Sequence, residues 1–281
     1  MTNSIIHNYT YGCAGIGDFL LASYQWYCYC DVNNIRYSVN FDCKNDVVKV
    51  DQKLFMVEGK YMQTPLANCF DLKSGYFDRY FKNYKYHVNI SNNDGSKFVN
   101  QLNYYMKSNK SFNYILFTNV HGSDISEKVD LRRDFLNFLK KNEILNERIN
   151  TLSKQIINFD NAIHLRLGDH GTFKKRPGTD KRISIENAKI ILDKHPHYFL
   201  FTDSEELKKE YRARTLDIIP THVSFHLDTN SKVIDTVAEF FILGKFTNIY
   251  YAHGAMSSFS RAAAFLHGRK YICINPEIAR L

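Results

Sequence analysis

The second half of the chain alternates strictly between short apolar runs and amphipathic segments, and this alternation constrains its fold more than any other feature. The apolar runs predict strands at 162–167, 198–202, 223–227, 249–252 and 271–274. The segments between them predict helices at 184–194, 204–214, 232–244 and 259–267. Strands and helices that alternate in this way form a parallel sheet with helices on both of its faces. The sequence therefore predicts a doubly wound α/β domain.

The first half begins with one β-α-β unit and is harder to interpret after it. A strand is expected over 4–11, a turn over 12–17, a helix over 18–32 and a second strand over 36–40. The aromatic, Asn- and Lys-rich stretch 41–100 contains only short ambiguous runs, whereas 114–118 is typical of a strand. Apolar spacing predicts a helix over 126–157 with a break near Asn142.

The length of 281 residues favours two domains, because it is about twice that of a typical domain. We place the boundary where the long helix ends, so that an N-terminal domain spans 1–155 and a C-terminal domain spans 156–281. The net charge of +8 suits an anionic partner such as a nucleotide, a nucleic acid or a membrane surface. Basic residues are spread along the chain, so a small anion fits as well as a polymer.

The sequence favours a cytoplasmic protein. It has no apolar stretch near 18 residues, so no transmembrane segment is expected, and its first residues do not have the pattern of a signal peptide. Six cysteines form no C-x-x-C pair, which is typical of reduced, buried thiols.

A first candidate site ends the strand at 162–167 and reads His164-Leu-Arg166-Leu-Gly168-Asp169. Strand alternation places His164, Arg166 and Gly168 on one face. Arginine is always charged and can bind a phosphate with two parallel hydrogen bonds. The alternative is a structural Arg–Asp pair at a strand end.

A second candidate site is the helix start Ser257-Ser258-Phe259-Ser260. The first N–H groups of a helix are unpaired and the helix dipole is positive there, so a phosphate can bind with help from the serine hydroxyls. The alternative is plain N-capping by a serine.

The loop Gly15-Ile-Gly17-Asp18 follows the first expected strand and opens the first helix. A lone G-x-G is a weak signal, and the dinucleotide-binding pattern fails because residue 20 is leucine. Asp18 can act as a helix cap, or as a carboxylate at an interdomain cleft that accepts a proton.

Three further polar residues lie near these motifs, each with a structural alternative. Glu239 is on the polar face of a helix, where solvation alone explains it, and Thr202 and Asp203 join a strand to a helix, where capping explains them.

The chain has no D-x-D pair and no His or Cys at metal-ligand spacing. No metal ion and no other cofactor is therefore expected, and a leaving diphosphate would depend on protein cations and helix dipoles.

Three of these segments resemble the α-1,2-fucosyltransferases and their α-1,6 and protein O-fucosyltransferase relatives. His164–Asp169 is similar to the motif H-x-R-R-G-D, Phe201-Thr-Asp203-Ser to F-S-D-D, and Ser257-Ser-Phe-Ser260 followed by Arg-Ala-Ala to S-S-F-S-W-W-A-A. The three lie in the same order and with similar spacing, over about residues 160–275.

The resemblance implies a GT-B architecture, with two Rossmann-like domains facing across a cleft, and an inverting transfer without a metal ion. It assigns Arg166 to the β-phosphate of GDP-fucose and His164 to a position against the nucleotide. Ser258 and Ser260 would hold phosphate or ribose, and Glu239 would contact guanine.

The sequence departs from that family at three points. Leu167 replaces a second arginine, Arg261-Ala262 replaces a tryptophan pair, and Asp18 stands where many relatives have asparagine. The segment Gly15-Ile-Gly17-Asp18-Phe-Leu-Leu is instead similar to the N-terminal loop of heptosyltransferases, in which that aspartate is thought to be the base. These departures concern the donor sugar more than the fold.

The sequence thus leads to a glycosyltransferase that moves L-fucose from GDP-fucose to a glycan hydroxyl. Asp18 would be the base, with Asp169 the second choice. Another nucleotide sugar, a GDP-hexose or an NDP-pentose, is the alternative within the class. A basic nucleic-acid-binding protein is the alternative outside it, but no nucleic-acid module is recognised and the charges form no stripe.

Overall fold

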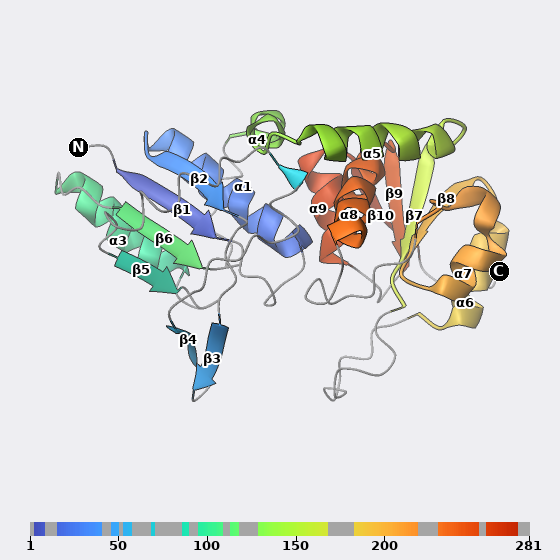
Figure 1. Ribbon diagram of the computed structural model, residues 1–281, viewed down its shortest axis with the longest axis horizontal. Helices are drawn as coiled ribbons and strands as arrows, with labels where there is room; N and C mark the ends of the chain where they lie inside the picture. The colour runs from blue at the N-terminus through green and yellow to red at the C-terminus, as the bar shows by residue number, and fades with distance from the viewer. Residues whose placement is uncertain are drawn as a thin grey trace. The chain divides into compact units, whose positions relative to one another are not determined.

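The computed structural model divides into two compact units, Met1–Asn142 and Glu143–Leu281, and each is described by itself. Figure 1 draws the described residues of both as ribbons. These residues are 3–8, 16–40, 46–50, 53–57, 69–70, 86–89, 95–108, 113–117, 129–167, 183–218, 230–252 and 257–274.

The second unit contains a four-stranded parallel sheet. Its strands are β7 (Asn161–Leu165), β8 (Tyr198–Thr202), β9 (Asn248–Ala252) and β10 (Lys270–Ile274), in the order β10-β9-β7-β8. All neighbouring strands are parallel, which confirms the α/β class expected from the alternation. The strand expected at 223–227 lies outside the described residues.

The helices of this unit cover both faces of its sheet. They are α6 (Ile185–Lys194), α7 (Glu205–Glu210), α8 (Asn230–Leu243) and α9 (Ser258–Leu266). Figure 1 shows α6 and α7 on one side of the sheet and α8 and α9 on the other. The chain passes from β7 to β8 in one direction and returns past β7 to β9 in the other, and right-handed crossovers then place the helices on opposite faces.

The same reversal creates a topological switch point between β7 and β9. In open α/β sheets ligands bind outside the carboxyl ends of the strands at such a point. The apolar face toward α6 and α7 is closed by a buried cluster that includes Ile163, Leu165 and Leu200 from the sheet and Ile191 from α6. This core fixes where the carboxyl ends of β7 and β8 lie.

Helix α5 (Glu143–Ser153) belongs to the second unit because it packs against α8. Leu145, Ile149 and Leu152 are its buried residues, and Arg148 forms an ion pair with Asp235 of α8. The units therefore divide after Asn142, ahead of α5, whereas the sequence placed the boundary at the far end of that helix.

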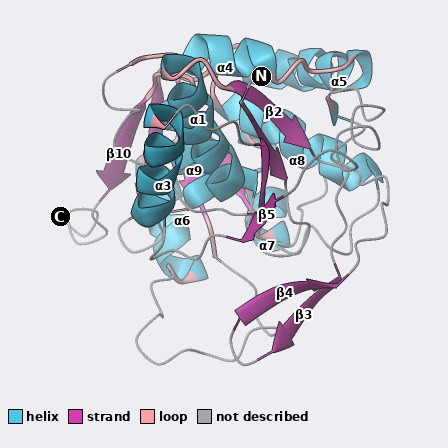
Figure 2. Ribbon diagram, turned by 90° about the vertical axis from the view of Figure 1, so that its left-hand side faces the viewer, coloured by secondary structure: helices cyan, strands magenta, loops and turns pink. Residues whose placement is uncertain are grey.

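The first unit has a parallel sheet of its own. Its strands are β1 (Ser4–Asn8), β2 (Arg36–Asn40), β5 (Tyr86–Asn89) and β6 (Asn113–Phe117), in the order β2-β1-β6-β5. Helices α1 (Ile16–Val32) and α3 (Gly95–Lys107) lie side by side (Figure 2). The Tyr29 hydroxyl of α1 donates to Asn103 Oδ1 of α3 at 2.9 Å, and Trp26 and Leu102 share a buried cluster with Ile5 of β1.

Two parts of the first unit bear on the sequence predictions. The stretch that was hard to read contains the antiparallel pair β3 (Asp46–Val50) and β4 (Lys53–Val57), as well as β5 and the start of α3. The expected break near Asn142 is confirmed: α4 (Arg132–Phe138) ends before Lys140, whose φ of 43° is left-handed, and α5 begins at Glu143. No helix among the described residues is long and apolar enough to cross a membrane.

Candidate functional site

The candidate site lies where β7 and β9 end and α9 begins. His164 is the fourth of the five residues of β7, and Arg166 follows the strand directly. Ser257 is the N-cap of α9, because its hydroxyl accepts a hydrogen bond from the Phe259 N–H at 3.3 Å. These groups therefore meet at the switch point of the sheet, which is where ligands of such sheets bind.

A buried hydrogen-bond network joins the strand to the helix. His164 Nδ1 lies 2.9 Å from Ser260 Oγ, and the same hydroxyl is 3.0 Å from the Tyr271 hydroxyl of β10. Ser260 is fully buried and His164 is only 8% exposed. Because a buried polar group without a partner is costly, these contacts hold β7, α9 and β10 in one arrangement.

The imidazole of His164 is neutral at neutral pH. Burial lowers the pKa of His164 from 6.5 to about 4; the nearby Asp203 carboxylate opposes this shift and the Arg166 guanidinium adds to it. The cation at this end of β7 is therefore Arg166.

Arg166 is half-buried and carries its charge without a counter-ion from the described residues. Asp203, the acidic residue at the end of β8, accepts a hydrogen bond through Oδ1 from the Leu167 N–H at 2.8 Å. The alternative that the sequence left open, a structural Arg–Asp pair, involves no aspartate of the described residues, and Asp169 lies outside them. A half-buried guanidinium at a switch point, with no ion pair to any residue that the structure describes, is suited to an anionic ligand.

The residues that end β8 hold the backbone around Arg166. Asp203 ties the segment after β7 to β8, while Thr202 Oγ1 accepts a hydrogen bond from the Ser204 N–H at 3.2 Å. The cap of α7 is Ser204, since its hydroxyl accepts from the Leu207 N–H. Asp203 therefore positions the segment after β7. Helix capping was the alternative role expected for Thr202 and Asp203, but the residue that caps α7 is Ser204.

Glu239 lies in α8 and is half-buried. Burial raises the pKa of its carboxyl group; Lys208 opposes the shift, and Asp203 and Asp235 add to it. Glu239 is thus in the electrostatic environment of the end of β8 rather than on a fully solvated helix face, the alternative that the sequence offered.

The remaining predicted residues belong to the first unit or lie outside the described residues. Gly17 is buried and Asp18 is half-buried in the first turn of α1, which follows β1 at the switch point between β1 and β6. Gly15 and Asp169 fall outside the described residues. The sequence missed Tyr271, whose only signal was its place in a predicted strand.

The first unit repeats the combination of histidine, serine and tyrosine. His7 is also the fourth of the five residues of its strand, and its Nδ1 lies 2.9 Å from Ser23 Oγ of α1 and 3.3 Å from the Tyr37 hydroxyl of β2. His7 and Ser23 are fully buried. Two residues after His7 the sequence has Tyr9 instead of an arginine, so the network alone does not make an anion site.

Among the described residues, no three His, Cys, Asp or Glu side chains lie close enough together to hold a metal ion.

Comparison with known proteins identifies the fold. No protein-family model matches the sequence, and no curated protein matches it in sequence. The structure is similar to that of a point mutant of Arabidopsis thaliana FUT1 in complex with GDP, with a TM-score of 0.50 and 14% identity over 99% of this chain and 72% of that one. It is also similar to the α-1,6-fucosyltransferase NodZ soaked with GDP-fucose, with a TM-score of 0.51 and 12% identity over 95% of this chain and 93% of that one.

A second structure of NodZ, from Bradyrhizobium, gives the same TM-score of 0.51 with 12% identity. These neighbours are fucosyltransferases of the GT-B fold. The protein therefore has a GT-B fold built from Rossmann-like units, as the sequence motifs implied.

The pKa of His164 makes stability depend on pH. Below pH 6.5 the unfolded chain binds a proton at this histidine that the folded protein rejects, so the free energy of unfolding falls as the pH drops from 6.5 toward 4. We expect this residue to contribute a loss of about 3 kcal/mol over that window and nothing above it. Urea unfolding at several pH values should therefore show a shallower acid limb for His164→Asn than for the wild type. Parallel acid limbs would contradict the assignment.

Proposed function

We propose that the protein is a metal-independent, inverting glycosyltransferase that moves L-fucose from GDP-fucose to a glycan hydroxyl. The observation that carries this proposal is Arg166, which has no ion pair among the described residues and follows the strand that His164 joins to α9, at the switch point of the sheet. The fold neighbours support the choice of donor, because they have been studied with GDP or GDP-fucose.

The proposed chemistry depends on stabilising the leaving diphosphate. As the bond between the sugar carbon and the GDP oxygen breaks, negative charge grows on the β-phosphate. Arg166 and the N–H groups at the start of α9 would bind that charge, with the Ser258 hydroxyl as a further donor. Ser260 would act indirectly, because its buried hydroxyl is already shared by His164 and Tyr271.

The other residues would hold the nucleotide. A neutral His164 can exchange a hydrogen bond with the donor without adding charge, and Glu239 can accept hydrogen bonds from the N–H groups of guanine. Asp203 would keep the segment that carries Arg166 in place through its bond to the Leu167 N–H. Gly15 and Gly17, which follow the first strand, and Thr202, which ends β8, are also proposed to line the donor site.

Inversion requires a base that takes the proton of the acceptor hydroxyl as that oxygen attacks the sugar from the face opposite GDP. We propose Asp18 for this role, with Asp169 as the alternative. The support is its half-buried place in the first turn of α1, which follows β1 at the switch point of the first sheet.

The position where the fucosyltransferase motif has a second arginine is occupied by Leu167, which is 3% exposed and part of the core on the α6 and α7 face. The phosphates would therefore depend on one arginine. This observation keeps another nucleotide sugar, a GDP-hexose or an NDP-pentose, as the second candidate donor.

A donor panel in excess EDTA tests the proposal. We expect GDP-fucose to be turned over faster than other nucleotide sugars, and GDP at 100 times its Kd to stabilise the fold by about 2.7 kcal/mol. A requirement for Mn²⁺ or Mg²⁺ would contradict the metal-independent mechanism. Absence of any GDP effect, with salt-dependent stabilisation by single-stranded DNA, would favour the nucleic-acid-binding alternative.

Replacing Arg166 tests the anion site. Arg166→Ala should lower kcat/KM by a factor that corresponds to about 3 kcal/mol or more, because the lost charge-assisted contact strengthens in the transition state. Arg166→Lys should recover only part of it, since the paired geometry is lost. Arg133→Ala, which removes an exposed arginine of α4, is the control in the same assay. Near-normal turnover of Arg166→Ala would remove the basis of the proposal.

Replacing Asp18 tests the base. Asp18→Asn keeps the size and the capping ability of the side chain but removes the basic oxygen, so turnover should fall by roughly 10²–10⁴ while GDP affinity and thermal stability are retained. Asp134→Asn is a matched control, because Asp134 is also an acidic residue in the first turn of a helix. Unchanged turnover would transfer the role to Asp169.

A further inference from the structure

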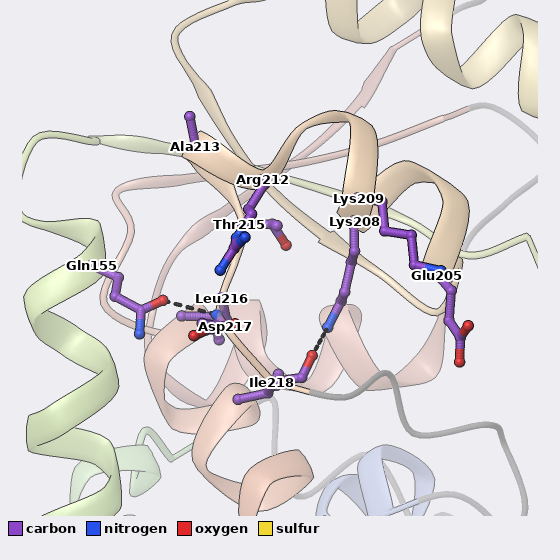
Figure 3. A pocket seen from close by; sticks show the side chains of 10 residues that line it. All are labelled: Gln155, Glu205, Lys208, Lys209, Arg212, Ala213, Thr215, Leu216, Asp217 and Ile218. Carbon is purple, nitrogen blue, oxygen red and sulfur yellow. Dashed lines mark hydrogen bonds between the residues drawn. The ribbon is translucent and has the colours of Figure 1, made fainter.

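A hollow of about 660 Å³ lies in the second unit, away from the switch point. Figure 3 shows the residues that line it: Gln155, Glu205, Lys208, Lys209, Arg212, Ala213, Thr215, Leu216, Asp217 and Ile218. Thr215 forms a β-bridge with Leu200 of β8, the edge strand of the sheet. Thr215 thus lies beside the edge strand β8, whereas the GDP-sugar site is proposed at the end of the central strand β7.

The hollow contains a lysine that is buried without a counter-ion. Lys208 is 8% exposed, and its ammonium group donates a hydrogen bond to the Ile218 carbonyl oxygen at 3.3 Å (Figure 3). Its charge opposes the rise that burial causes in the pKa of Glu239, but no carboxylate of the described residues lies within ion-pairing distance of it. Buried charges are normally paired, so this ammonium group has capacity for an anion.

A buried hydroxyl in the same hollow also lacks a partner. Thr215 is 7% exposed, and within the described structure its Oγ1 forms no hydrogen bond. Hydroxyls in this position are normally satisfied by protein, water or ligand.

Arg212 and Lys209 also line the hollow, so three cationic side chains and the two carboxylates of Glu205 and Asp217 border it. The nearby Arg214 illustrates the usual structural role of an arginine, since its guanidinium donates to the carbonyl oxygens of Leu192 and His195. Arg212 is exposed, and among the described residues it forms no ion pair. Lys208 and Arg212, which form no ion pair with any described residue, and the Thr215 hydroxyl thus border one space.

We propose that this hollow binds the phosphate group of a sugar monophosphate. The phosphate oxygens accept hydrogen bonds from Lys208, Arg212 and the Thr215 hydroxyl. A phosphate fills only a small part of the volume, and the rest is bordered by apolar groups of Leu216 and Ile218. The Asp217 carboxylate, also at the border, disfavours a second anionic group and can accept hydrogen bonds from sugar hydroxyls. A neutral sugar body on one phosphate matches this distribution.

Backbone amide NMR titrations of the full chain test the proposal with two probes, inorganic phosphate and glucose 6-phosphate. We expect both to shift the amides of residues 212–218, and glucose 6-phosphate to bind more tightly. Lys208→Met and Arg212→Gln should each weaken binding by at least about tenfold, because each removes a charge-assisted hydrogen bond. Lys208→Met keeps the length of the side chain, so the fold should tolerate it.

Two controls separate this site from the proposed donor site. Lys194→Met removes an exposed lysine of α6 outside the hollow and should leave binding unchanged. Arg166→Ala should also leave it unchanged, even if that variant no longer binds GDP. The proposal is overturned if phosphate shifts only residues 257–260, if Lys208→Met and Arg212→Gln bind like the wild type, or if neither probe binds at 50 mM. Equal affinity for both probes would show that free phosphate, not a sugar phosphate, is recognised.

Discussion

The hydrogen bond between His164 Nδ1 and Ser260 Oγ is the contact on which the candidate site depends. It connects the central strand β7 to the first turn of α9 across a buried interface. Because both side chains are buried, neither can replace this hydrogen bond with one to solvent water. Tyr271 closes the network from β10 at 3.0 Å. Because the histidine is held, Arg166 leaves the strand at a fixed place beside the start of α9. The site is therefore built by a polar contact in the core rather than by its surface loops.

The first unit shows that this contact and anion binding are separate properties. His7, Ser23 and Tyr37 make a similar network at the same position of a central strand, but the sequence continues to Tyr9 and supplies no arginine there. A parallel sheet with a helix on its central strand has few polar groups at this depth, and a histidine and a serine that hydrogen-bond to each other satisfy both side chains. A similar network thus occurs in both units, and Arg166 is the residue that distinguishes the second one.

Sequence pattern predicted the second unit well because its signals are local. The alternation of apolar runs located all four described strands of this unit. Ser184 and Ser257 are the N-caps of α6 and α9, which is a common role for a serine that precedes a helix. The network was not predictable, since Ser260 lies 96 residues from His164 and only the fold brings them together. The helix 143–153 could not be assigned to its unit from spacing alone, because its packing against α8 decides the matter. Short strands such as β3 and β4 gave too little periodicity to be recognised.

The net charge of +8 does not by itself indicate what the protein binds. The hydrogen-bond and ion-pair partners of each cationic side chain are more informative. Arg148 forms an ion pair with Asp235, and Arg214 donates hydrogen bonds to carbonyl oxygens at the end of α6. Both arginines therefore have structural roles in the fold. Arg166 and Lys208 are half-buried or buried, and within the described residues neither has a counter-ion. A desolvated cation without a counter-ion is costly unless a ligand completes it. Arg166 follows the central strand β7, whereas Lys208 lies in α7, which follows the edge strand β8. The described residues thus leave two separate cations without a counter-ion, which is why we propose a small anion at each.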